Sequence, residues 1–302
     1  MPYRPRSLSH VRTAMWAGVV AASTAGLLAA GTVDPVPAAA APEPARSDSA
    51  TLRSDPATAA FLARVQPRGK ERVTAAVLDL DGGDGRPVVY GDDTPYDTAS
   101  IVKVDILAAA LLEAQDAGRD LTAQERAEAE AMIEHSDNAA AGALWRRIGL
   151  APGLDTANKR LGLTSTEGGS GPTWGLTRTT ASDQIRLLCA VFAPDHAPDR
   201  APGSASPALN EESRTYLRAL MSRVSPEQAW GVSAAGSGWA LKNGWLQRTT
   251  TGLWDVNSVG RITTGGRRYL VVVLSDGSTT MRDGVSMTER AARAAVSSAA
   301  AR

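Results

Sequence analysis

The order of the elements in the sequence predicts an α+β fold. Strand patterns lie near both ends of the chain, at residues 72–80, 87–90, 239–245, 254–262 and 268–276. Helical patterns fill the middle, from Ile101 to about Phe192. Because strands from distant segments can pair only if the chain returns to the same sheet, we expect one antiparallel sheet built from both chain ends. Flanking helices and a helical subdomain would complete it.

The first forty residues have the pattern of an export signal. Arg4, Arg6 and Arg12 precede an apolar run at residues 14–31, and an A-x-A cleavage region ends near Ala41. This layout predicts a signal peptide over residues 1–41 and a secreted protein, extracellular or associated with the cell wall. An uncleaved membrane anchor is the alternative, since the apolar run is near the minimum spanning length.

The remaining chain divides into a short leader and one domain. Residues 42–54 are polar and predict a flexible leader, so the domain would cover residues 55–302. Asp55 as cap and Pro56 in the first turn predict where the first helix begins. Helices are expected at residues 55–65, from Ser100 onward, and at 121–134, 138–148, 154–161, 179–192, 210–221 and 287–296.

Two irregular segments separate these helices. A glycine-rich loop covers residues 162–177, and a stretch rich in proline and aspartate at 193–203 predicts a surface excursion. The sequence contains no internal repeat.

Composition excludes several classes of function. Removal of residues 1–41 leaves a formal net charge of −2, which does not favour nucleic-acid binding or electrostatic membrane attachment. Cys189 is the only cysteine, so no internal disulfide can form, and its apolar neighbours predict a buried structural thiol. No histidine–cysteine spacing suits a metal. We therefore expect a monomer without metal or cofactor, acting on a small molecule.

The stretch T-A-S-I-V-K-V-D contains the first candidate site residues. Ser100 and Lys103 are three positions apart and would share one helix face. A lysine in apolar surroundings either finds partners or loses its proton. Only four of the 32 basic residues are lysines, and lysine, unlike arginine, can give up its proton. For this motif alone, a helix cap followed by a snorkelling lysine is the alternative.

Two further clusters complete a recognisable set. Ser136, Asp137 and Asn138 stand at a junction between helices, and Lys242-Asn243-Gly244 stand on a predicted strand. With Ser100 and Lys103, the chain resembles the class A β-lactamases and their penicillin-binding relatives, whose signature is S-x-x-K, S-D-N and K-T-G. The resemblance implies the β-lactamase/transpeptidase type of α+β fold and a secreted serine hydrolase that opens β-lactams.

The resemblance also implies a role for each residue. Ser100 would be the nucleophile, Lys103 would accept or relay its proton, and Ser136 would pass a proton to the leaving nitrogen. The substrate would be bound by Asn138, Lys242, Asn243, Gly244 and Trp245, with the N–H groups of Ser100 and Trp245 forming the oxyanion hole. Asp137 is expected to be a buried structural residue.

The sequence departs from the signature at three points. Asn243 replaces the hydroxyl residue that helps to bind the substrate carboxylate. Ser100 and Ser136 are closer in sequence than is typical of class A enzymes, which predicts a more open site. Glu167 is the only carboxylate in the 162–177 loop, so it is either the base for deacylation or a solvated loop residue.

Three functions follow from these departures. The first is a β-lactamase, which requires fast deacylation. The second is a DD-peptidase or penicillin-binding protein acting on cell-wall peptides, which would keep a long-lived acyl-enzyme. The third is a degenerate, non-catalytic binding module.

Overall fold

The computed structural model describes residues 55–82, 85–196 and 207–301. The predicted signal peptide at residues 1–41 and leader at 42–54 lie outside the described residues. Within the described part of the chain, no helix is both long enough and apolar enough to cross a bilayer.

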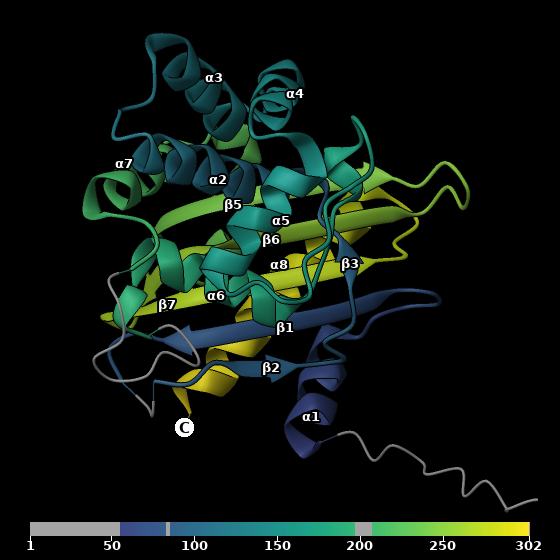
Figure 1. Cartoon of the computed structure of the whole chain (residues 1–302). Helices are drawn as coiled ribbons and strands as arrows, with labels where there is room; N and C mark the ends of the chain where they lie inside the picture. The colour runs from purple at the N-terminus through teal and green to yellow at the C-terminus, as the bar shows by residue number, and fades with distance from the viewer. Residues whose placement is uncertain (1–54, 83–84, 197–206, 302) are drawn as a thin grey trace, which may run out of the picture. The chain divides into compact units, whose positions relative to one another are not determined.

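The centre of the structure is a five-stranded antiparallel sheet. Its spatial order is β2-β1-β7-β6-β5, which places strands from the two chain ends side by side (Figure 1). The strands are β1 (Arg72–Asp79), β2 (Val88–Tyr90), β5 (Ser237–Gln247), β6 (Trp254–Thr264) and β7 (Arg267–Asp276). The predicted α+β fold is therefore confirmed, and β5 is an edge strand.

Helices cover both faces of this sheet. Figure 1 shows α8 behind the sheet and the helices from α2 to α7 in front of it. The helices are α1 (Pro56–Val65), α2 (Val102–Asp116), α3 (Ala123–Glu134), α4 (Asn138–Arg147), α5 (Leu150–Leu161), α6 (Ala181–Phe192), α7 (Glu211–Met221) and α8 (Met281–Ala300). Successive side chains of a strand point to opposite faces. Accordingly, Ala76 and Leu78 of β1 pack with the α2–α7 layer, whereas Ala75 and Val77 pack with α1 and α8.

Several boundaries differ from the prediction. The last helix begins at Met281 rather than residue 287, because the Thr280 side chain caps it by accepting from the Asp283 N–H. Helix α5 begins at Leu150 rather than residue 154. Cys189 is buried as predicted, and burial raises the pKa of its thiol to about 12.

A small second sheet was not predicted. Strands β3 (Tyr96–Asp97) and β4 (Arg178–Thr179) pair antiparallel, and Glu167 extends them by a bridge to Arg178. Two 3₁₀ turns, η1 (Ala99–Ile101) and η2 (Trp174–Leu176), lie beside this sheet in the sequence. The two-residue strands are too short to give a periodic sequence signal.

Helix α2 is the central element of the helical layer. It is buried along most of its length, including the ionisable side chains of Lys103 and Asp105. Both carboxylate oxygens of Asp105 are buried without a hydrogen-bond partner among the described residues. Burial, with smaller contributions from Asp183 and Asp155, raises the pKa of Asp105 to about 8.

Asp105 should therefore make the protein less stable as the pH rises. The folded state holds this proton up to about pH 8, whereas the unfolded chain releases it near pH 4, so stability falls between these values. We expect Asp105→Asn to remove most of that fall and to raise the free energy of unfolding at pH 8 by about 3 kcal/mol. Urea unfolding at pH 5 and pH 8 measures this effect. An equal change at both pH values would contradict it.

Candidate active site

Ser100 lies in the η1 turn that leads into α2. The residue before it, Ala99, has φ +48°, a left-handed conformation that is costly for a non-glycine residue. The surroundings hold this turn in place: the Thr98 N–H donates to the Thr177 carbonyl at 2.8 Å, and the Asn257 amide donates to the Thr98 carbonyl at 3.1 Å. The Ser100 backbone is thus fixed by the 162–177 loop on one side and by β6 on the other.

Lys103 is the first of two fully buried lysines. Its Nζ donates to the Ser136 carbonyl at 2.7 Å, to Ser136 Oγ at 3.0 Å and to Asn138 Oδ1 at 2.8 Å. It also lies 4.8 Å from the ring centroid of Trp174. Burial lowers the pKa of Lys103 to about 7, with Asp137 opposing the shift. Near neutral pH, Lys103 can therefore either accept or donate a proton.

Lys242 reaches the same hydroxyl group from the edge strand. Its Nζ donates to Ser136 Oγ at 3.1 Å and to the Asn243 carbonyl at 3.0 Å. Burial, reinforced by repulsion from Lys103, lowers the pKa of Lys242 well below its ordinary value. Ser136 Oγ thus accepts from both lysines with its two lone pairs, which leaves its own O–H free to donate to a further group.

Ser136 occupies the junction between α3 and α4. Its φ of +56° is left-handed, and this turn directs both its carbonyl and its hydroxyl toward Lys103. Asp137 caps α4 by accepting from the Ala140 N–H at 2.7 Å. The prediction that Asp137 is buried is wrong, because its side chain is exposed, as an N-cap carboxylate can be.

The glycine of K-N-G brings the edge strand against the nucleophile turn. A Cβ at Gly244 would lie 2.6 Å from the Ser100 N, 2.7 Å from the Ile101 N and 2.8 Å from the Thr98 O. Only glycine permits this approach. The next residue along β5, Trp245, therefore lies beside the Ser100 backbone, where the sequence predicted the two oxyanion-hole donors.

Asn243 is placed differently from its expected role. It is fully buried, and its Nδ2 donates to the carbonyls of Gln228 at 2.6 Å and Trp230 at 3.0 Å. Since alternate residues of a strand face opposite ways, Asn243 points away from the face that carries Lys242. Both of its amide hydrogens are used within the protein, so they are not free to bind a substrate carboxylate.

Glu167 is not among the contacts of the two lysines. Its backbone pairs with Arg178, whose N–H donates to the Glu167 carbonyl at 2.9 Å, and its side chain is exposed. The residue of the 162–177 loop that does contact Lys103 is Trp174. Sequence reasoning missed this tryptophan, because an aromatic residue in an irregular loop has no periodicity to indicate its partner.

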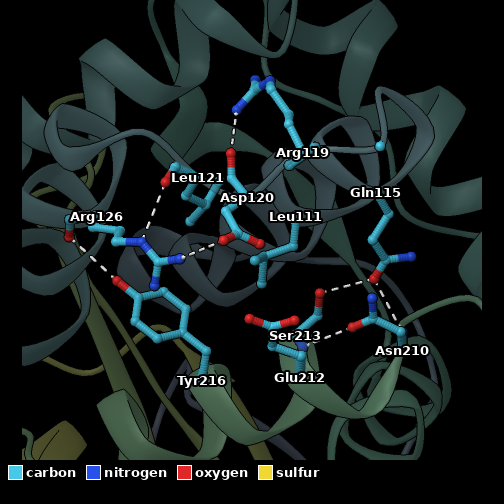
Figure 2. A pocket seen from close by; sticks show the side chains of 12 residues that line it. Leu111, Gln115, Arg119, Asp120, Leu121, Arg126, Asn210, Glu212, Ser213 and Tyr216 are labelled. Atoms are coloured by element: carbon cyan, nitrogen blue, oxygen red, sulfur yellow. Dashed lines mark hydrogen bonds and ion pairs between the residues drawn. The ribbon is translucent and has the colours of Figure 1, made fainter.

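A separate cavity of about 380 Å³ lies between α2, α3 and α7, far along α2 from Lys103 (Figure 2). None of the predicted site residues lines it. Some of its polar groups bond to one another: Gln115 accepts from Ser213 Oγ at 2.8 Å and from the Asn210 N–H at 3.0 Å. Within the described residues, no cluster of three histidine, cysteine or acidic side chains could hold a metal.

Comparison with known proteins identifies the family. Residues 125–300 match the family described as Beta-lactamase2, beta-lactamase enzyme family. The match spans more than half of the chain, and the chain belongs to this family. No curated protein matches the sequence.

Solved structures share the fold at low sequence identity. A substituted PBP-A, in an acyl-enzyme complex with penicillin G, is 20% identical with a TM-score of 0.65, covering 82% of this chain and 97% of that one. The TLA-1 extended-spectrum β-lactamase is 15% identical with a TM-score of 0.66, covering 80% and 99%. A class A β-lactamase from Bacteroides cellulosilyticus is 16% identical with a TM-score of 0.64, covering 82% and 99%. These likenesses establish the β-lactamase/transpeptidase fold.

A substitution that adds one methyl group at position 244 tests the importance of the close approach between β5 and the Ser100 turn. Gly244→Ala must displace the backbone of β5 or of the Ser100 turn, since the clashing atoms are all backbone. We expect acylation by a β-lactam to slow by about 100-fold, the usual effect of losing one oxyanion donor. Stopped-flow acylation measures it. Gly142→Ala in α4 is the matched control, because its Cβ would meet only the Arg146 side chain at 3.4 Å; equal rates in the two variants would contradict the prediction.

The pKa of Lys103 predicts how acylation depends on pH. A lysine is neutral, and able to accept the Ser100 proton, only above its pKa. Single-turnover acylation should therefore rise about tenfold per pH unit up to about pH 7 and level off above it. Lys103→Arg, which cannot lose its proton, should acylate at least about 100-fold more slowly. A wild-type rate that is constant from pH 5 to pH 9 would exclude Lys103 as the base.

Proposed function

We propose that this protein opens the amide bond of β-lactams by forming an acyl-enzyme on Ser100. The observation that carries the proposal is the Ser136 hydroxyl, 3.0 Å from the Lys103 Nζ and 3.1 Å from the Lys242 Nζ. Lys103 is also only three residues from Ser100, about one helical turn, and therefore offers a short path for protons between the nucleophile and the leaving group. Membership of a β-lactamase family supports the same chemistry.

Each residue has a distinct part in acylation. Neutral Lys103 takes the proton of Ser100, whose Oγ bonds to the lactam carbonyl carbon. The oxyanion that forms is stabilised by the N–H groups of Ser100 and Trp245. As the carbon–nitrogen bond breaks, Ser136 gives its proton to the leaving nitrogen and regains one from Lys103. Asn138, whose Oδ1 accepts from Lys103, contributes its amide N–H groups to the substrate.

The fate of the acyl-enzyme distinguishes two functions. Trp174 covers Lys103 at 4.8 Å, and the Glu167 side chain is exposed and makes no described hydrogen bond to the site. A ring cannot activate the water that removes the acyl group. This observation favours the second candidate, a penicillin-binding or DD-peptidase type of protein with a long-lived acyl-enzyme.

A non-catalytic binding module agrees less well with the site. A binder has no need for two buried lysines on one hydroxyl, which are costly to desolvate. We also propose, from residues 1–41, that the domain is exported to the compartment where cell-wall peptides and β-lactams meet it.

An intact-mass time course tests the proposal. The domain covering residues 55–302 is mixed with penicillin G, and both the protein mass and the hydrolysed drug are followed. We expect an adduct on Ser100 that persists after free drug is removed, and none in Ser100→Ala. Fast release with accumulating product would identify a β-lactamase, and Glu167→Gln would then show whether Glu167 is its base. Absence of an adduct with penicillins, cephalosporins and acyl-D-Ala-D-Ala mimics would contradict the proposal.

A further inference from the structure

One segment between α7 and β5, residues 225–230, is bonded to the turn that carries Ser136. Ser225 Oγ lies 2.8 Å from the Nδ1 of His135. The Gln228 Nε2 donates to the His135 carbonyl at 3.0 Å. Because His135 immediately precedes Ser136, this carbonyl belongs to the peptide group that leads into Ser136. The Gln228 side chain therefore holds that peptide group directly.

The same segment is bonded to the edge strand β5. The Nδ2 of Asn243 donates to the Gln228 carbonyl at 2.6 Å and to the Trp230 carbonyl at 3.0 Å. Asn243 directly follows Lys242, whose Nζ donates to Ser136 Oγ at 3.1 Å. Gln228 is thus bonded through its side chain to the residue before Ser136, and through its backbone to the residue after Lys242.

The turn at Ser136 needs support of this kind. Its φ of +56° is left-handed, and a residue other than glycine keeps such a conformation only where the surroundings fix it. Rotation of the peptide before Ser136 would move its carbonyl and its hydroxyl away from the Lys103 Nζ, from which they accept at 2.7 Å and 3.0 Å. The bond from Gln228 opposes that rotation, because it holds the carbonyl of the same peptide.

The two amide groups of this bridge are held with their oxygens unpaired. Gln228 and Asn243 are buried, and neither the Oε1 of Gln228 nor the Oδ1 of Asn243 has a hydrogen-bond partner among the described residues. Turning either amide over would place its oxygen against a carbonyl oxygen, so both amides must face as they do. A buried acceptor without a partner costs stability. Such a cost is typical of groups that place a functional turn.

We propose that Gln228 is a positioning residue for Ser136: its amide fixes the peptide before Ser136, and its anchorage by Asn243 keeps the Ser136 hydroxyl between the two buried lysines. This inference rests on the proposed function, since it names the residue that directs the proton donor of the Ser100 reaction. Gln228 acts through Ser136, so its loss should slow most the step in which Ser136 gives a proton to the leaving group.

Two esters with one acyl group isolate that step. Phenylacetylglycine is esterified either to 4-nitrophenol or to 4-nitrobenzyl alcohol. In each ester Ser100 Oγ bonds to the carbonyl carbon, the ester carbon–oxygen bond breaks, and the proton of Ser100 passes to Lys103. From there it reaches the nitrobenzyl oxygen through Ser136, whereas 4-nitrophenolate departs as a stable anion and the proton is released to water. Both esters give the same acyl-enzyme, so the rate constants of acylation can be compared.

Gln228→Met keeps a side chain of similar length and removes the donor. We expect it to slow acylation by the nitrobenzyl ester about tenfold and acylation by the nitrophenyl ester less than about twofold, since only the former needs a positioned proton donor. Ser136→Ala should give the same pattern with a larger loss. Adding Gln228→Met to Ser136→Ala should have no further effect, because both residues act through one hydroxyl. Equal slowing of both esters, or additive losses in the double variant, would overturn the proposal.

Gln115→Met is the matched control. The Gln115 Nε2 also donates to a backbone carbonyl at 3.0 Å, that of Ala208, but Gln115 lines the cavity of Figure 2 rather than the candidate active site. This variant loses a hydrogen bond of the same kind and should leave the ratio of the two acylation rates unchanged. A change in the ratio as large as that in Gln228→Met would indicate a general loss of stability and overturn the positioning role.

A measurement without substrate separates this inference from the proposed function. The chain contains only four lysines, so their side-chain carbon resonances can be followed one by one by NMR. Displacement of Ser136 in Gln228→Met should shift the resonances of Lys103 and Lys242 and leave those of the two exposed lysines unchanged. This shift, in a protein that no β-lactam or ester acylates, would count against the proposed function alone. Unchanged resonances of both buried lysines would overturn the positioning role, whatever the activity.

Discussion

Two buried lysines share one serine hydroxyl, and the site depends on this contact. Lys103 comes from the central helix α2, Lys242 from the edge strand β5, and Ser136 from the junction between α3 and α4. Among the described residues, neither ammonium group has a hydrogen bond to a carboxylate. Burial and mutual repulsion therefore disfavour the state in which both are charged. Because both lysines are desolvated, a proton can move among Lys103, Ser136 and Lys242.

Backbone geometry makes this contact possible. Ser136 adopts a left-handed conformation that presents both its carbonyl and its hydroxyl to Lys103. Ala99, the residue before Ser100, also has a left-handed backbone conformation. Such conformations cost about 1–3 kcal/mol each and persist where the surroundings fix them. At Ser100 the fixing groups are the Thr177 carbonyl, the Asn257 amide and the close approach of Gly244. The candidate site residues Ser100 and Ser136 thus lie at strained turns between the helical layer and the sheet.

The sequence predicted the parts of this site that depend on residue spacing, and not those that depend on loop paths. The three motifs come together because they lie on or between regular elements, α2, α3, α4 and β5, whose sequence patterns can be recognised. Trp174 and Gln228 lie in irregular segments, and their partners are set by tertiary hydrogen bonds such as those of Asn243. Asp137 was expected to be buried, whereas it is an exposed N-cap. Strands β3 and β4 have two residues each, too few for any period to be recognised.

The contact between Lys103 and Trp174 raises a question about which charge state the site favours. A ring at 4.8 Å stabilises the ammonium form by about 0.5–2 kcal/mol. Burial moves the pKa from 10.5 to about 7, which corresponds to about 5 kcal/mol in favour of the neutral amine. Burial is the larger effect, so near neutrality a substantial fraction of Lys103 is a free base. A carboxylate in place of the ring would stabilise the ammonium form more strongly and could itself accept a proton from water. In the acylation that we propose for Ser100, Lys103 can therefore act as the base, whereas Trp174 offers no base for deacylation.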